Sequence, residues 1–151
     1  MTTTTDVVQR RGSFRDTYRM HGYYFKEAAT LTILVGFCLH LYRVIFGDEA
    51  ALQYVVTQTT DTLLMIPMTY AAVTGILGYR RMVFANKVHR VALTAALAYI
   101  AVSVPLHIYV TLVMADVSFY VHMAGYWFSY LLLIVVYPLF LTMFWKLHYK
   151  S

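Results

Sequence analysis

Residues 91–114 read VALTAALAYIAVSVPLHIYVTLVM, a run without Lys, Arg, Asp or Glu. A helix rises 1.5 Å per residue, so about 20 predominantly apolar residues cross a hydrocarbon layer roughly 30 Å thick. Three further apolar segments lie at 26–46, 55–78 and 122–145. The sequence therefore predicts an all-α, polytopic membrane protein. Its four transmembrane helices should form an up-down bundle, because the connections between them are short.

The composition of the whole chain agrees with this prediction. Of 151 residues, 60% are hydrophobic and 13% are charged, whereas about a quarter of the residues in soluble domains are charged. We expect one membrane domain over 1–151, with 1–25 as a polar cytoplasmic segment. That segment lacks the apolar stretch of a cleavable signal, so we expect it to be retained. A soluble catalytic domain needs roughly 50 residues or more, and we expect the four spans to leave no room for one.

The basic residues gather on one side of the predicted spans. The connections GDEAALQY and ADVSFY carry Asp48, Glu49 and Asp116 but no Lys or Arg. The positive-inside rule therefore predicts cytoplasmic N- and C-termini, in a bacterial plasma membrane. The basic loop at 79–90 should contact anionic lipids of the bilayer. Eleven of the 12 Lys and Arg residues lie on the predicted cytoplasmic side: Arg10, Arg11, Arg15, Arg19, Lys26, Arg80, Arg81, Lys87, Arg90, Lys146 and Lys150.

Three ionisable side chains occur at one depth inside the spans. His40 lies six residues before the end of span 26–46, Asp61 six residues after the start of span 55–78, and His107 seven residues before the end of span 91–114. At 1.5 Å per residue, each lies roughly 9–10 Å below the outer boundary. Ionisable groups inside a membrane are costly and usually functional. We therefore expect a polar pocket in the outer half of the bundle.

Helical spacing predicts which side chains accompany these three. Positions three or four apart share a helix face, which places Arg43 beside His40 and Tyr99 and Ser103 beside His107. The fourth span would add His122 at its outer end, with Tyr126 and Ser129 further in. The alternative is a purely structural role, in which these side chains only pair neighbouring membrane helices, for example Arg43 with Asp61. Arg43 also lies near enough to the boundary to extend its charged group toward water.

The leading hypothesis is a redox role. Two histidines at equal depth on separate helices could ligate haem b from both faces, and His, Asp, Arg and Tyr side chains could instead bind and protonate a quinone. The chain would then be a small subunit of a larger membrane-bound electron-transfer or oxidoreductase complex, not an enzyme alone. The candidate cofactor-binding residues are His40, His107, Arg43, Asp61, Tyr99 and Tyr126.

A second hypothesis is a metal site. His40, His107 and Asp61 make a two-His, one-carboxylate set suited to Fe, Cu or Zn, with His122 as a fourth ligand. A third hypothesis is a non-catalytic accessory or assembly subunit, whose polar cluster only fixes helix packing. Other membrane subunits or further copies of the chain are the expected partners. We expect His21, His89 and His148 to face water or lipid headgroups.

Several classes of function are excluded. The single cysteine, Cys38, provides no disulfide within one chain and no CxxC pair. The sequence contains no GxSxG and no phosphate-binding GxxxxGK motif. No folded basic domain is present, so nucleic acid is not an expected partner.

Overall fold

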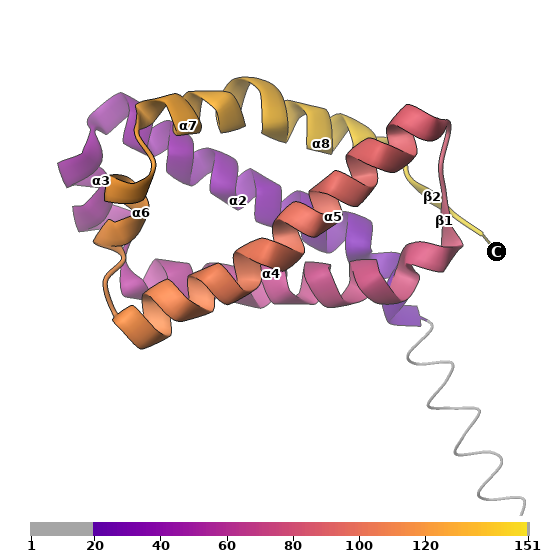
Figure 1. Ribbon diagram of the computed structural model, residues 1–151, viewed down its shortest axis with the longest axis horizontal. Coiled ribbons are helices and arrows are strands. Elements are labelled where there is room, and N and C mark those ends of the chain that lie inside the picture. Colours follow the sequence, from indigo (N-terminus) through magenta and orange to yellow (C-terminus); the bar gives the residue numbers. More distant parts are fainter. Residues whose placement is uncertain (1–19, 151) are drawn as a thin grey trace, which may run out of the picture.

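The computed structural model describes residues 20–150 as a bundle of helices (Figure 1). Within this range, four helical segments are long and apolar enough to cross a membrane: Gly22–Phe46, Gln58–Arg81, Lys87–Met114 and Tyr126–Trp145. The four segments run alternately in opposite directions and pack side by side (Figure 1). Most of the predicted polar N-terminal segment, with Arg10, Arg11, Arg15 and Arg19, lies outside the described residues.

Each span is built from one or more helices. The first consists of a 3₁₀ turn, Gly22–Tyr24, and α2, Phe25–Phe46; the second of α4, Gln58–Gly78, and a 3₁₀ turn, Tyr79–Arg81. The third joins α5, Lys87–Ile108, to a π-helix, Tyr109–Met114. The fourth contains α7, Tyr126–Leu131, a π-helix, Leu132–Val136, and α8, Tyr137–Trp145.

The spans begin a few residues away from their approximate predicted starts, and for three of them a local reason is visible. The second span begins at Gln58 instead of 55, because the Thr57 side chain caps the helix by accepting from the Thr60 N–H. The third begins at Lys87 instead of 91, because the Asn86 side chain accepts from the His89 N–H. The fourth begins at Tyr126 instead of 122, because extended backbone at 124–125 separates it from a short helix.

Both ends of the bundle carry structure that the sequence did not predict. At one end lie two short helices, α3 at Asp48–Tyr54 and α6 at Ser118–Met123. At the other, β1 (Met82–Val83) pairs antiparallel with β2 (His148–Tyr149). This pairing ties the connection between the second and third spans to the chain segment after the fourth.

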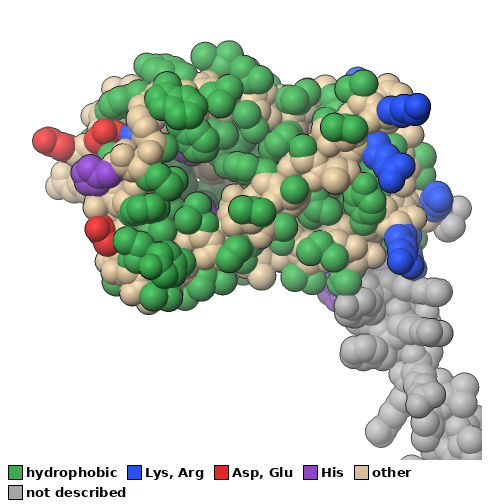
Figure 2. Space-filling model, in the orientation of Figure 1, with side chains coloured by type: hydrophobic (Ala, Val, Ile, Leu, Met, Phe, Trp, Pro, Cys, Tyr) green, Lys and Arg blue, Asp and Glu red, His purple; other side chains and the backbone are tan. Residues whose placement is uncertain are grey.

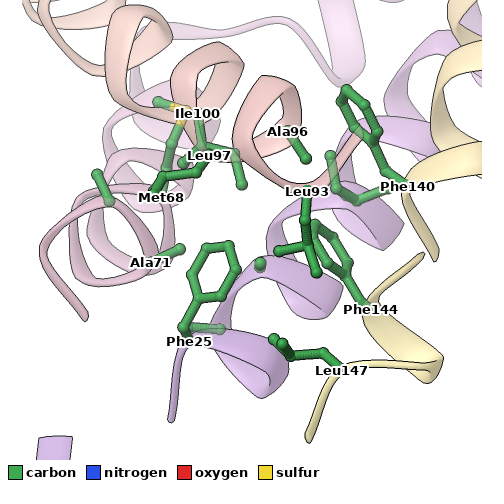
Figure 3. Close-up of a cluster of buried hydrophobic side chains, with 14 of the residues drawn as sticks. Phe25, Met68, Ala71, Leu93, Ala96, Leu97, Ile100, Phe140, Phe144 and Leu147 are labelled. Carbon is green, nitrogen blue, oxygen red and sulfur yellow. The ribbon is translucent and has the colours of Figure 1, made fainter. Parts of the chain in front are cut away.

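The hydrophobic core fills the half of the bundle near β1 and β2. Phe25 and Phe144 are almost wholly buried and meet edge to face, with ring centroids 5.6 Å apart. Leu93 and Leu97 of α5 pack around them (Figure 3). Aromatic and aliphatic side chains therefore fill this half.

Charge is segregated along the length of the bundle (Figure 2). We call the end with Asp48, Glu49 and Asp116 the acidic end, and the opposite end, with Arg80, Arg81, Lys87, Arg90, Lys146 and Lys150, the basic end. Hydrophobic side chains cover the surface between the two ends; Val102 and Ile134, for example, are 69% and 71% exposed. Such a surface is suited to lipid.

His89 does not face water, contrary to expectation. Its side chain is buried, 3% exposed. Nδ1 accepts from the Ala85 N–H at 2.9 Å, so Nε2 carries the proton and donates to the Met143 carbonyl oxygen at 3.0 Å. His89 therefore links the start of the third span to the end of the fourth.

Candidate functional site

A cavity of about 200 Å³ occupies the half of the bundle toward the acidic end. Its wall is largely apolar, with a few polar side chains facing inward. Side chains from every span and from α6 line it, and those used below are Gly36, His40, Arg43, Asp61, Tyr99, Ser103, His107, Tyr120, Phe128 and Tyr137.

The cavity lies where two helices diverge. α5 packs against α4 and α8, whereas α7 packs against α2. Toward the acidic end, α5 and α7 separate (Figure 1), and the space-filling view shows a hollow between them, bordered by hydrophobic side chains (Figure 2). The cavity is therefore open on the side of the bundle, within the apolar band of the surface.

Asp61 lies at the centre of one cluster of polar side chains. The carboxylate is buried and accepts hydrogen bonds from the hydroxyls of Thr111 and Tyr120, the latter at 3.2 Å. Its other oxygen lies 2.6 Å from Nδ1 of His107. Burial, with the nearby Asp61 carboxylate, raises the pKa of the Tyr120 hydroxyl, which therefore keeps its proton and donates it.

The Asp61 contacts determine where the His107 proton resides. A carboxylate only accepts, so Nδ1 of His107 carries the hydrogen and donates it. The imidazole ring lies over the Tyr120 ring, with centroids 4.9 Å apart and planes inclined by 30°. Both contacts hold the ring in place. In the neutral imidazole, the second nitrogen, Nε2, is left with a lone pair.

His40 is held in a similar way by a hydroxyl. Its Nδ1 lies 2.9 Å from Oγ of Ser129, which also accepts from Arg43 at 3.3 Å. A guanidinium only donates, so the single hydroxyl hydrogen of Ser129 is free to point at His40. Within residues 20–150, Nδ1 of His40 is the acceptor available to it, and a buried hydroxyl hydrogen left without an acceptor would cost free energy. Nδ1 therefore accepts, and Nε2 of His40 carries the hydrogen.

Both Nε2 atoms face open space. Neither has a hydrogen-bond partner in the described part of the chain, and there no fully buried side-chain nitrogen or oxygen lacks a partner. The two Nε2 atoms are therefore accessible, and both residues line the cavity. The cavity thus presents a donor, from His40, and an acceptor, from His107.

Arg43 does not pair with Asp61 and does not extend to water. It is 4% exposed, and its Nε donates to the Asp48 carboxylate at 2.7 Å. Nη2 donates to the carbonyl oxygens of Val121 and Ala124, at 3.2 and 2.9 Å. Arg43 therefore anchors α3 and the end of α6 to α2, and its hydrogen bonds are made within the protein.

Two tyrosines lie at the inner end of the cavity. Tyr99 and Tyr137 come from the third and the fourth span, and both line the cavity. Gly36 makes room for this pair, because a Cβ atom there would lie 3.0 Å from the Tyr137 hydroxyl. The Ser103 hydroxyl donates to the carbonyl oxygen of Tyr99 in its own helix, at 2.7 Å, and so leaves the space beside it free.

Two of the predicted site residues lie outside the cavity. The Tyr126 ring lies under the Arg43 guanidinium, 5.1 Å from ring centroid to Cζ. His122 is exposed, and its Nδ1 is bonded to the Ser118 carbonyl oxygen of its own helix at 2.8 Å. Among residues 20–150, no group of three or more His, Cys, Asp or Glu side chains could hold a metal ion. The Fe, Cu or Zn site stays a prediction.

Three residues of the site were missed or misread from the sequence. Thr111 was not noticed, although it lies four residues after His107 and so close to the same helix face. Neither Tyr120 nor Tyr137 was predicted to belong to the site. For Tyr137 the sequence carries no signal beyond its position within the last span.

No protein-family model, no curated protein and no solved structure matches this chain.

Proposed function

We propose that this chain is a small membrane subunit of a larger redox complex and that its cavity binds a quinone. The observation that carries the proposal is the pair of imidazoles, His40 and His107, that present Nε2 atoms to one largely apolar cavity. Ligand sites are commonly apolar cavities with a few well-placed polar groups. A quinone fits this pattern, because its ring is apolar and its two oxygens form hydrogen bonds.

The position of the cavity supports a lipid-soluble ligand. The hollow opens between α5 and α7, in the apolar band between the two charged ends (Figure 2). A quinone dissolved in the bilayer could enter sideways without crossing water. Its isoprenoid tail could remain outside, along exposed hydrophobic side chains.

The size of the cavity favours a quinone over haem b. About 200 Å³ is below the roughly 300–1,000 Å³ typical of pockets for drug-sized ligands, so it suits one ring system and not a porphyrin. The electrons would be exchanged with a redox centre of a partner subunit. Asp61 and His107 together would transfer protons to or from the ligand oxygen.

The test is binding of a short-chain quinone to the purified full-length protein in detergent. Decylubiquinone and menadione, offered separately in equilibrium dialysis, should each bind at one molecule per chain. Ser103→Phe should abolish binding by filling the cavity. Thr142→Phe is the matched control, because Thr142 also bonds to its own helix, at the Pro138 carbonyl oxygen, but is exposed. Equal binding by both variants would place the quinone elsewhere and refute the proposal.

Haem b is a second candidate, favoured by one observation. Haem-ligating histidines typically donate the hydrogen of their other ring nitrogen to a protein group, and Nδ1 of His107 donates to Asp61 in this way. His40 would have to exchange its tautomer to ligate through Nε2. Helices α2 and α5 would have to move apart to admit the macrocycle. Absorption spectra of the air-oxidised and dithionite-reduced protein decide this, because bis-histidine haem gives a Soret band and sharp reduced α and β bands.

A further inference from the structure

We infer that the cavity discriminates between the two redox forms of its ligand and prefers the quinol to the quinone. This inference rests on the proposed function and adds the identity of the bound form. It follows from the hydrogen-bond polarity of the two imidazoles that line the cavity, His107 and His40.

The first step concerns His107. Asp61 accepts from Nδ1 of His107 at 2.6 Å, and its other oxygen already accepts from Thr111 and Tyr120. With three donors around it, this carboxylate is an acceptor throughout, so in the neutral imidazole Nε2 of His107 presents a lone pair to the cavity. A quinol hydroxyl can donate to that lone pair. A quinone carbonyl cannot, and its oxygen would oppose the nitrogen lone pair.

The second step concerns His40. Arg43 donates to the hydroxyl oxygen of Ser129, so the hydroxyl hydrogen of Ser129 is free to be donated to Nδ1 of His40. Nε2 of His40 therefore presents an N–H group. Both a quinol hydroxyl and a quinone carbonyl can accept from it, so His40 binds either form. The discrimination comes from His107.

The third step concerns the alternatives within the cavity. Ser103 is bonded to its own helix. Arg43 donates to Asp48, Ser129 and two backbone carbonyl oxygens. On the described wall, the two Nε2 atoms are therefore the imidazole positions open to a ligand, one a donor and the other an acceptor. A ligand with a hydroxyl at one end matches both of them.

The expected preference is about tenfold. An intramolecular hydrogen bond contributes roughly 0.5–1.5 kcal/mol net, and 1.4 kcal/mol corresponds to a factor of ten in affinity. A quinone would also leave the lone pair of His107 without a partner, which increases the difference. The same ring and tail must be compared in both forms, so that hydrophobic burial cancels.

The experiment is isothermal titration of the full-length protein in detergent, under anaerobic conditions, with decylubiquinol and with decylubiquinone. We expect the quinol to bind about ten times more tightly to the wild type. Asp61→Asn should remove or reverse the preference, because an amide N–H can donate to Nδ1 of His107 and move the proton to Nε2, the wrong-tautomer effect known from catalytic triads. Asp116→Asn is the matched control: it makes the same change in an exposed carboxylate outside the cavity, which accepts from Ser118, and it should keep the preference.

A second measurement tests the tautomers without any ligand. Long-range ¹H–¹⁵N spectra of histidine-labelled protein distinguish Nδ1–H from Nε2–H, and His→Gln variants assign the signals. We expect Nδ1–H for His107 and Nε2–H for His40. The opposite tautomer at His107 would overturn the inference.

The outcomes separate the two proposals. If the quinone binds in the cavity at least as tightly as the quinol, the preference is refuted and the proposed function stands. If neither form binds, both proposals are refuted. If the quinol is preferred and Asp61→Asn abolishes that preference, the inference is supported.

Discussion

Nε of Arg43 lies 2.7 Å from the carboxylate of Asp48, five residues along the chain, although Arg43 is buried and Asp48 is partly exposed. A buried guanidinium has to satisfy its donors with protein groups. Arg43 does so with Asp48, Ser129 and the carbonyl oxygens of Val121 and Ala124. Arg43, which the sequence predicted near the candidate site, therefore holds α3 and the end of α6 against α2.

Arg43→Lys should destabilise the protein by about 2 kcal/mol or more, because an ammonium group cannot reach the same four acceptors and hydrogen bonds to charged groups contribute roughly 1.5–3 kcal/mol each. Asp48→Asn should cost less than about 1 kcal/mol, since the Asp48 side chain is 37% exposed. Thermal unfolding in detergent measures both. An unchanged midpoint for Arg43→Lys would contradict the anchoring role.

His89→Phe should cost about 1–3 kcal/mol, because it leaves the Ala85 N–H and the Met143 carbonyl oxygen without their partner in a buried position. His148→Phe is the control, because His148 is exposed and surface substitutions usually change stability by less than 0.5 kcal/mol. The comparison uses the same unfolding assay. Equal midpoints for the two variants would show that the His89 link contributes nothing.

Gly78→Ala should destabilise the bundle by about 1–3 kcal/mol, through overpacking. A Cβ at Gly78 would come within contact distance of the carbonyl oxygen of Gly22, and a backbone atom cannot rotate away. At Gly125 an added Cβ would meet only the Trp127 side chain, which is 67% exposed and can move. Gly125→Ala is therefore the control and should unfold within about 0.5 kcal/mol of wild type.

His40→Ala and His107→Ala should each reduce quinol binding about tenfold or more while the protein still inserts and folds, because each removes one of the two imidazole hydrogen bonds open to the ligand. His21→Ala is the matched control. His21 bonds to the Tyr70 hydroxyl at 2.8 Å and lies outside the cavity. Equilibrium dialysis measures binding, and circular dichroism verifies the fold. Wild-type binding by both cavity variants would contradict the proposed function and leave the accessory-subunit hypothesis.

The sequence predicted the depth of the polar residues better than their partners. Because the rise per residue is fixed, counting from the span ends placed His40, Asp61 and His107 at one level, and the structure has all three on one cavity wall. Counting also gave the shared faces within one helix. It gave no rotation of one helix against another, so it left a pairing of Arg43 with Asp61 open and included Tyr126 and His122 among the candidates.

Some features of the site depend on backbone irregularities that a periodic pattern does not reveal. The π-helix at Tyr109–Met114 contains Thr111, and the break at 124–125 separates α6 from α7. α6 then lies across the acidic end and brings Tyr120 to Asp61. The sequence analysis predicted one regular helix over 122–145 and therefore did not predict α6 as a separate helix.

By itself, the sequence determined four apolar helices and the segregation of charge to the two ends of the bundle, because length, composition and helical rise are properties of each segment alone. The tertiary structure decided which nitrogen of each imidazole is bonded and which faces the cavity. It did so because hydrogen-bond partners come from different helices, and their approach is set by side-chain packing across the whole bundle.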